Sequence, residues 1–172
     1  GFTISFSPDG QSIAYLATNN SPRKVPIGGG SSVAIPVEGG AGLTAIEFNG
    51  PDRFIVATQG ALATLAPNGT LTRFAEPDSF TGRTAWALEQ VLPDAWVLAR
   101  YWRSPPNGPV VAINPATGAR MKLIDVDVVW VGYANGLLVW ALPDGALFSA
   151  PWDLKKKGPV GPGTPLGATV LS

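Results

Sequence analysis

Apolar and polar residues alternate along this chain in short segments separated by turn-forming residues. At the start of the sequence Phe2, Ile4 and Phe6 alternate with Thr3 and Ser5. A period of two is typical of a β-strand with one buried face. The opening segment therefore predicts a strand rather than a helix.

A second kind of segment is apolar at consecutive positions instead of alternate ones. It occurs at residues 54–57, 96–99 and 137–140. A strand in a sheet with one solvent-exposed face would alternate, whereas a strand covered on both faces need not. These segments predict sheets that lie between two neighbours.

A turn motif recurs at a nearly constant interval. It appears as Ser7-Pro8-Asp9-Gly10, Gly50-Pro51-Asp52-Arg53, Leu92-Pro93-Asp94-Ala95 and the shorter Asn135-Gly136. The steps from Asp9 to Asp52, Asp94 and Asn135 are 43, 42 and 41 residues. In the first copy Pro8 presets φ, Asp9 bonds its own backbone and Gly10 accepts a positive φ. A period of roughly forty residues with several short strands per unit indicates a β-propeller.

The expected fold is all-β: a β-propeller of four consecutive four-stranded antiparallel blades. The blades should cover approximately residues 1–40, 41–79, 80–125 and 126–172. The expected strands are 2–6, 12–18, 24–27 and 32–37; 43–48, 54–58, 61–66 and 70–74; 84–91, 96–102, 110–114 and 120–124; and 126–133, 137–142, 146–151 and 168–171. A β-sandwich also uses many short strands, but it does not explain the period.

Two resemblances extend this interpretation. Residues 4–15, ISFSPDGQSIAY, resemble the Ser-Pro-Asp-Gly repeat of TolB-type, WD40-like bacterial propellers. Residues 144–154 and 161–165, together with 90–94 and 111–118, are similar to the propeller that follows the kinase domain and membrane helix of some bacterial Ser/Thr protein kinases. The resemblance implies an extracytoplasmic, non-catalytic sensor or interaction module. No kinase motif is present in this sequence; a separate kinase domain would belong to the parent protein.

Composition narrows the chemistry. The 12 basic and 12 acidic residues cancel, so neither nucleic acid nor an anionic membrane is an expected partner. The chain has no cysteine and no histidine, which removes thiolate chemistry and the commonest general base and metal ligand. Turn chemistry accounts for Asp9, Asp52 and Asp94 without a metal ion. We expect no metal site, no cofactor and no catalytic residue, and no apolar run is long enough for a membrane span.

Two glutamates are the main candidates for a ligand site. Glu47 and Glu89 each lie five residues before the aspartate of their turn, on the first strands of adjacent blades. They should stand side by side near the central channel, where water can solvate a carboxylate. Either they are paired or solvated structural residues, or they form a polar ligand site in the channel mouth. The possible partners are Arg53, Arg83 and Arg100.

Trp102 is a third candidate ligand-binding residue. It stands beside the long connection at residues 103–108, so its ring could make an exposed aromatic contact. Packing between blades is the alternative explanation.

The favoured function is a non-catalytic binding or sensing module that engages a protein, a peptide or a small ligand at the channel mouth. The alternative is a carboxylate-dependent propeller enzyme, such as a glycan hydrolase or lyase, for which only Glu47 and Glu89 can be nominated. A raised pKa of one of them in an open cleft would favour the enzyme.

Neither end of the chain offers a conspicuous strand to close the ring. Gly1 begins inside a strand, and residues 158–167 are rich in glycine and proline. The four blades are therefore expected to belong to a larger ring. The remaining blades would come from the parent chain or from a second copy in a homodimer.

Overall fold

The computed structural model describes residues 4–40, 42–76, 85–102, 109–153, 158–159 and 162–169. Within these ranges the one helical element is a short 3-10 turn, η1 (Glu38–Gly40), and all other regular structure is strand. The expected all-β class is confirmed. No helix in this part of the chain is long and apolar enough to cross a membrane.

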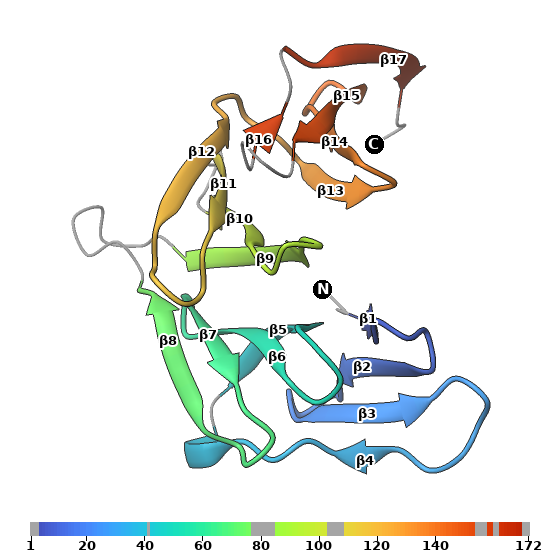
Figure 1. The fold of residues 1–172 in the computed structure, drawn as a ribbon, viewed down its shortest axis with the longest axis vertical. Coiled ribbons are helices and arrows are strands. Elements are labelled where there is room, and N and C mark those ends of the chain that lie inside the picture. The colour runs from blue at the N-terminus through green and yellow to red at the C-terminus, as the bar shows by residue number, and fades with distance from the viewer. Residues whose placement is uncertain are drawn as a thin grey trace.

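The strands form four antiparallel sheets that follow one another along the sequence (Figure 1). The first blade contains β1 (Ile4–Phe6), β2 (Ser12–Leu16), β3 (Pro22–Pro26) and β4 (Val33–Ala34). The second contains β5 (Leu43–Phe48), β6 (Phe54–Thr58), β7 (Ala61–Leu65) and β8 (Leu71–Ala75). The third contains β9 (Ala85–Val91), β10 (Val97–Trp102), β11 (Val110–Ile113) and β12 (Arg120–Ile124). The fourth contains β13 (Trp130–Ala134), β14 (Leu137–Ala141), β15 (Ala146–Asp153), β16 (Gly158–Pro159) and β17 (Thr164–Thr169). The four-blade prediction is confirmed, with the outer strand of the fourth blade split in two.

The clearest error in the expected strand bounds concerns the last strand. It was expected at residues 168–171, but β17 begins at Thr164 and pairs with Phe148 and Ser149 of β15. A Cβ at Gly163 would collide with the ring of Trp140, so only glycine allows the chain to approach this close. Part of the glycine- and proline-rich segment at residues 158–167 therefore belongs to strand β17 and is not a loop.

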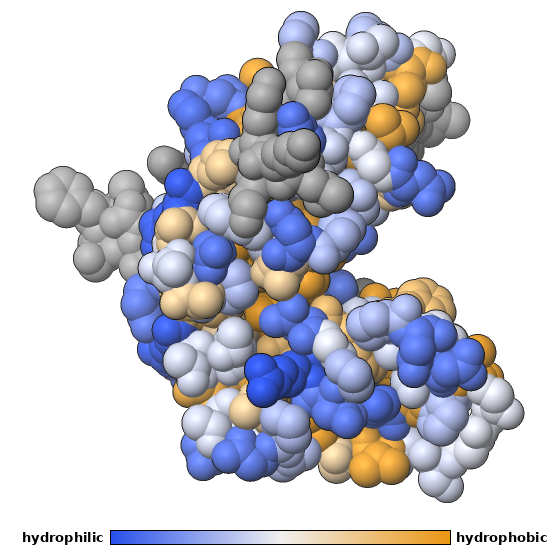
Figure 2. All heavy atoms as spheres, in the orientation of Figure 1, coloured by the Kyte–Doolittle hydropathy of each residue, from blue (hydrophilic) through white to orange (hydrophobic). Residues whose placement is uncertain are grey.

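The blades are arranged around a common axis (Figure 1). The first strands β1, β5, β9 and β13 lie near the centre, and the outer strands β4, β8, β12 and β17 lie at the periphery. Contacts join blade one to two, two to three and three to four. The arc is open between the fourth blade and the first, and Figure 2 shows this side as a notch in the molecular surface.

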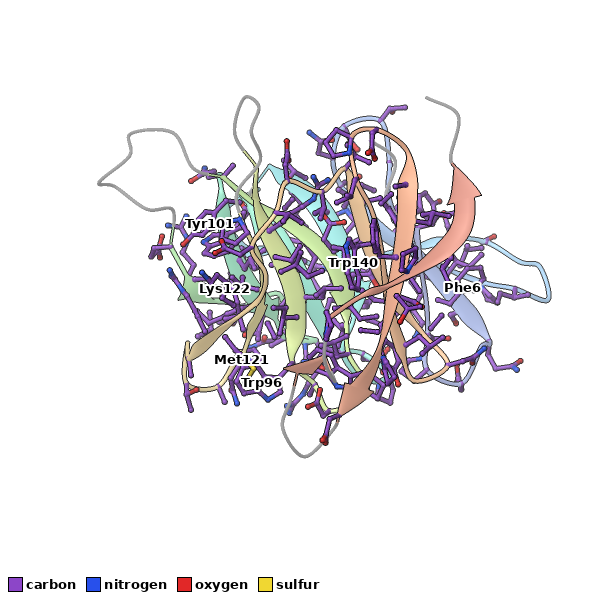
Figure 3. All side chains as sticks on the ribbon, turned by 90° about the horizontal axis from the view of Figure 1, so that it is seen from above. Phe6, Trp96, Tyr101, Met121, Lys122 and Trp140 are labelled. Carbon is purple, nitrogen blue, oxygen red and sulfur yellow. The ribbon has the colours of Figure 1, made fainter. Side chains whose placement is uncertain are left out.

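Three apolar clusters hold the arc together, one between each pair of neighbouring blades. Members of the first cluster include Ala14, Ile46, Phe48, Val56 and Leu65. Members of the second include Ala45, Ile55, Leu62, Trp86 and Val97. Members of the third include Leu98, Val131, Leu138, Trp140 and Trp96, and Met121 packs against this cluster. Figure 3 labels Trp96, Met121 and Trp140. Burial of apolar area between sheets is thus the main contribution to stability.

The second strands show why their sequences are apolar at consecutive positions. All five residues of β6 are buried, because this strand lies between the first and third blades. In β2, which has a neighbour on one side, only the central residue, Ala14, is buried. The number of neighbouring blades therefore accounts for the difference between these two strands.

The first turn forms as its sequence predicts. The Ser7 hydroxyl donates to Oδ1 of Asp9 at 2.6 Å, and the Gln11 amide donates to the same oxygen at 3.0 Å. The hydrogen bond from Ser7 lowers the pKa of Asp9 below its ordinary value. Gly10 has φ +68°, which confirms the expected positive φ.

We expect Gly10→Ala to lower the free energy of unfolding by about 1 kcal/mol, since alanine is strained at positive φ. The added methyl group would meet no atom within 4 Å, so the backbone alone causes the loss. Gly28→Ala is the matched control, because Gly28 has the same open surroundings without a positive φ. Urea denaturation measures both variants, and equal midpoints would show that the turn conformation is wrong.

Candidate functional site

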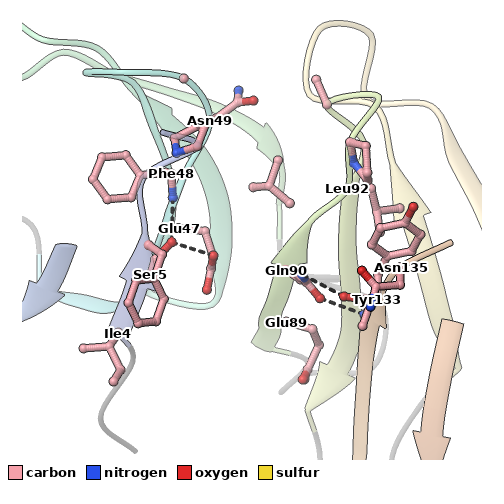
Figure 4. Close-up of a pocket in the computed structure, with 17 residues that line it drawn as sticks. Ile4, Ser5, Glu47, Phe48, Asn49, Glu89, Gln90, Leu92, Tyr133 and Asn135 are labelled. Atoms are coloured by element: carbon pink, nitrogen blue, oxygen red, sulfur yellow. Dashed lines mark hydrogen bonds between the residues drawn. The ribbon is translucent and has the colours of Figure 1, made fainter. Parts of the chain in front are cut away.

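The inner ends of all four blades line a cavity of about 670 Å³ at the axis (Figure 4). Its polar lining residues include Ser5, Glu47, Asn49, Glu89 and Gln90. The two glutamates chosen from the sequence are thus brought to one cavity from the neighbouring strands β5 and β9. Of the described residues that line it, none is a lysine or an arginine.

Glu47, on β5 of the second blade, carries a largely buried carboxyl group that is hydrogen-bonded to a residue of the first blade. The Ser5 hydroxyl donates to Oε2 of Glu47 at 2.8 Å and accepts a hydrogen bond from the Phe48 amide at 3.0 Å. Burial raises the pKa of Glu47 to about 7, and the hydrogen bond from Ser5 opposes this shift. Near neutral pH the group therefore exists as both acid and carboxylate, able to donate or accept a hydrogen bond.

Glu89 has a different environment. In the β9–β10 ladder Leu98 pairs with Gln90 and Ala99 with Leu88, so Glu89 is the extra residue of a β-bulge. Its Oε1 accepts a hydrogen bond from Nε of Arg100 at 2.5 Å, with both side chains largely buried. Nη1 of Arg100 also donates to the Val128 carbonyl at 3.0 Å. The pair joins the third blade to the segment that leads into the fourth, which is a structural role.

A repeated polar position, not noticed in the sequence, connects the inner strands. Ser5, Glu47 and Gln90 are spaced by 42 and 43 residues, and each lies two residues before the residue whose amide closes its turn. The Gln90 side chain accepts from the Tyr133 amide at 2.7 Å and donates to the Tyr133 carbonyl at 3.1 Å. It joins blade three to four much as Ser5 joins blade one to two. The signal was available as a polar residue at one fixed place in otherwise apolar strands.

Only some of the remaining residues predicted from the sequence lie within the described part of the structure. Trp102 ends β10, but its side chain, the loop at 103–108 and Arg83 lie outside the described residues. Of the three arginines considered as partners, Arg100 binds Glu89. Within the described ranges no three acidic side chains gather closely enough to hold a metal ion.

Comparison with known proteins supports the fold. No family model and no curated protein sequence matches this chain. Among solved structures it is similar to an auxiliary nutrient binding protein from Bacteroides thetaiotaomicron, with TM-score 0.67, 11% identity, and coverage of 96% of this chain and 41% of that one. It is also similar to a putative TolB from Agrobacterium tumefaciens, with TM-score 0.66, 11% identity and coverage of 87% and 57%. The β-propeller domain of Cps50 (Swd1) from Myceliophteria thermophila has TM-score 0.61, 11% identity and coverage of 89% and 52%.

These similarities show a β-propeller fold, and the similar structures include TolB-like and WD40-like propellers. This chain spans roughly half the length of each of the three structures. Sequence identity is low in every comparison, so the likeness extends to the fold alone.

The buried carboxyl group of Glu47 should make stability fall as pH rises from about 4.5 to about 7. In the unfolded chain Glu47 has its ordinary pKa of 4.5 and is ionised throughout this window. In the folded chain its pKa is about 7, so the carboxyl group keeps its proton until that pH. The folded state binds more protons, so the free energy of unfolding decreases with pH, by a total on the order of 3 kcal/mol. Below 4.5 this contribution is fully present, and above 7 it is lost.

Urea denaturation between pH 4.5 and about 8 measures this effect on Glu47→Gln. The amide cannot titrate, so the variant should lose this part of the pH dependence. Glu38→Gln, at an exposed position of η1, is the control and should behave as the unmodified chain. Identical pH profiles for the two variants would contradict the assignment to Glu47.

Proposed function

We propose that this propeller segment is a non-catalytic binding or sensing module that takes a small polar ligand into the axial cavity. The observation that carries the proposal is the position of Glu47: a largely buried carboxyl group lining a cavity to which all four blades contribute. Leaving a carboxyl group in such a place is costly unless a partner compensates it. A ligand with hydrogen-bond donors supplies that partner.

The lining defines the chemistry of the ligand. Carboxyl and amide groups of Glu47, Asn49 and Asn135 offer hydrogen-bond acceptors, while Tyr133 adds aromatic surface. Hydroxyl or amino groups on a partly apolar framework match this combination. Sugars and small amines are therefore the ligand classes that fit best.

The names of two similar structures support binding in general terms, since one is described as a nutrient binding protein and another as a TolB. Together with the resemblance to propellers of bacterial kinases, they support a bacterial, extracytoplasmic location.

One observation favours the alternative, a carboxylate-dependent glycan hydrolase or lyase. A pKa of about 7 suits a general acid, which is what Glu47 would have to be. A glycosidase also needs a second carboxylate as nucleophile or base. Glu89 is the nominated second group, but its Oε1 is bound to Arg100. The arrangement therefore fits binding better than hydrolysis.

A thermal-shift panel tests the proposal with glucose, xylose, N-acetylglucosamine, cellobiose, lysine, arginine and spermidine, each at millimolar concentration. We expect at least one compound to raise the melting temperature by a few degrees, since a ligand at about 100 times its Kd stabilises by about 2.7 kcal/mol. Glu47→Gln should reduce the shift several-fold, whereas Glu38→Gln should keep it.

The same variants distinguish the alternative. No shift with any compound, or an equal shift in Glu47→Gln, would contradict a cavity site that depends on Glu47. Release of glucose from cellobiose, abolished in Glu47→Gln and retained in Glu38→Gln, would show that the protein is a hydrolase, since a sugar leaving group needs protonation by the general acid.

A further inference from the structure

The face of the first blade that borders the gap between blades one and four carries exposed apolar side chains. Ile4 is 60% exposed and Phe6 is 61% exposed. Both lie on β1, where Phe6 pairs with Ile13 and Ile4 with Tyr15 of β2. Figure 3 shows Phe6 on the first blade, on the side of the molecule away from Trp96 and Met121. Two large apolar residues on one strand face would normally be covered.

The next blade shows what covers these positions. Ile46 and Phe48 follow Ile4 and Phe6 by 42 residues and occupy the same face of β5. They are 0% and 5% exposed, because they pack against the first blade around Ala14. The apolar face of β1 is therefore equivalent to the face of β5 that packs against the preceding blade.

The fourth blade presents the opposite face. Trp130 is 50% exposed, and Leu137, on the same face at the other end of the β13–β14 pair, is also exposed. Gly132, 42 residues after Gln90, lies under the Trp130 ring, where a Cβ would come within 2.7 Å of the indole. In the third blade the residue at this place, Gln90, binds the inner strand of the following blade. The fourth blade thus ends in a face that elsewhere receives a following blade.

We propose that both faces are interfaces for further blades of the same propeller, carried by the same polypeptide outside residues 1–172. The expected occupants are four-stranded antiparallel blades with apolar residues on both faces. The two faces are the two different halves of the interface that is already formed three times between consecutive blades. This chain covers 57% and 52% of two similar solved chains, so each of those chains has room for further blades within one polypeptide.

Thiol labelling of the complete gene product tests the proposal, since residues 1–172 contain no cysteine that would interfere. Phe6→Cys and Trp130→Cys report on the two faces. Ile27→Cys, at a position 49% exposed in an outer turn, is the reactive control, and Ala14→Cys, at a position fully buried between blades, is the protected control. We expect both test thiols to react at least about 100-fold more slowly than the thiol of the reactive control, as for groups that need local opening. The protein should be monomeric by light scattering.

Three results would overturn the proposal. They are labelling at the rate of Ile27→Cys, protection that disappears when a dimer dissociates on dilution, and a gene product without blades beyond these four. The second result would assign the covering to another copy. Circular dichroism checks that each variant is folded. If neither test variant folds, hydrogen exchange is measured on the unmodified gene product. Slow exchange of the β1 and β13 amides would support burial of the two faces, and fast exchange would exclude it.

Discussion

Apolar packing between consecutive sheets is the interaction on which this structure depends. A four-stranded blade with apolar residues on both faces cannot be stable in water by itself, because one or both faces would remain exposed. The repeat solves this by giving every blade a face that receives the preceding sheet and a face that receives the following one. The second blade is the complete case, with all five residues of β6 buried.

The polar site exists because this packing ends at the axis. Between the sheets the side chains are apolar, but at the inner strands Ser5 and Gln90 form hydrogen bonds with the neighbouring blade instead. Glu47 occupies the same repeat position, and its carboxyl group lies in the cavity under partial burial. The raised pKa and the proposed ligand binding thus have one origin: a polar position held at the edge of an apolar stack.

The sequence was sufficient for the architecture because turn chemistry is local. Pro8, Asp9 and Gly10 specify a turn wherever they occur together, and the period between such turns set the number of blades. It also indicated that Glu47 and Glu89 should approach the axis. Their different environments depend on strand pairing. Glu89 lies at a bulge in the β9–β10 ladder and binds Arg100, whereas Glu47 accepts a hydrogen bond from Ser5. Neither that bulge nor the close contact of Gly163 with Trp140 has a local sequence signal.

Backbone hydrogen exchange on the 172-residue chain is the most direct test of the claim that neighbouring blades bury each other's faces. The account predicts the slowest exchange in β6 and β10, whose blades have a neighbour on both sides, and clearly faster exchange in β2 of the first blade. Exchange in β2 that is as slow as in β6, or uniform exchange across the second strands, would contradict it.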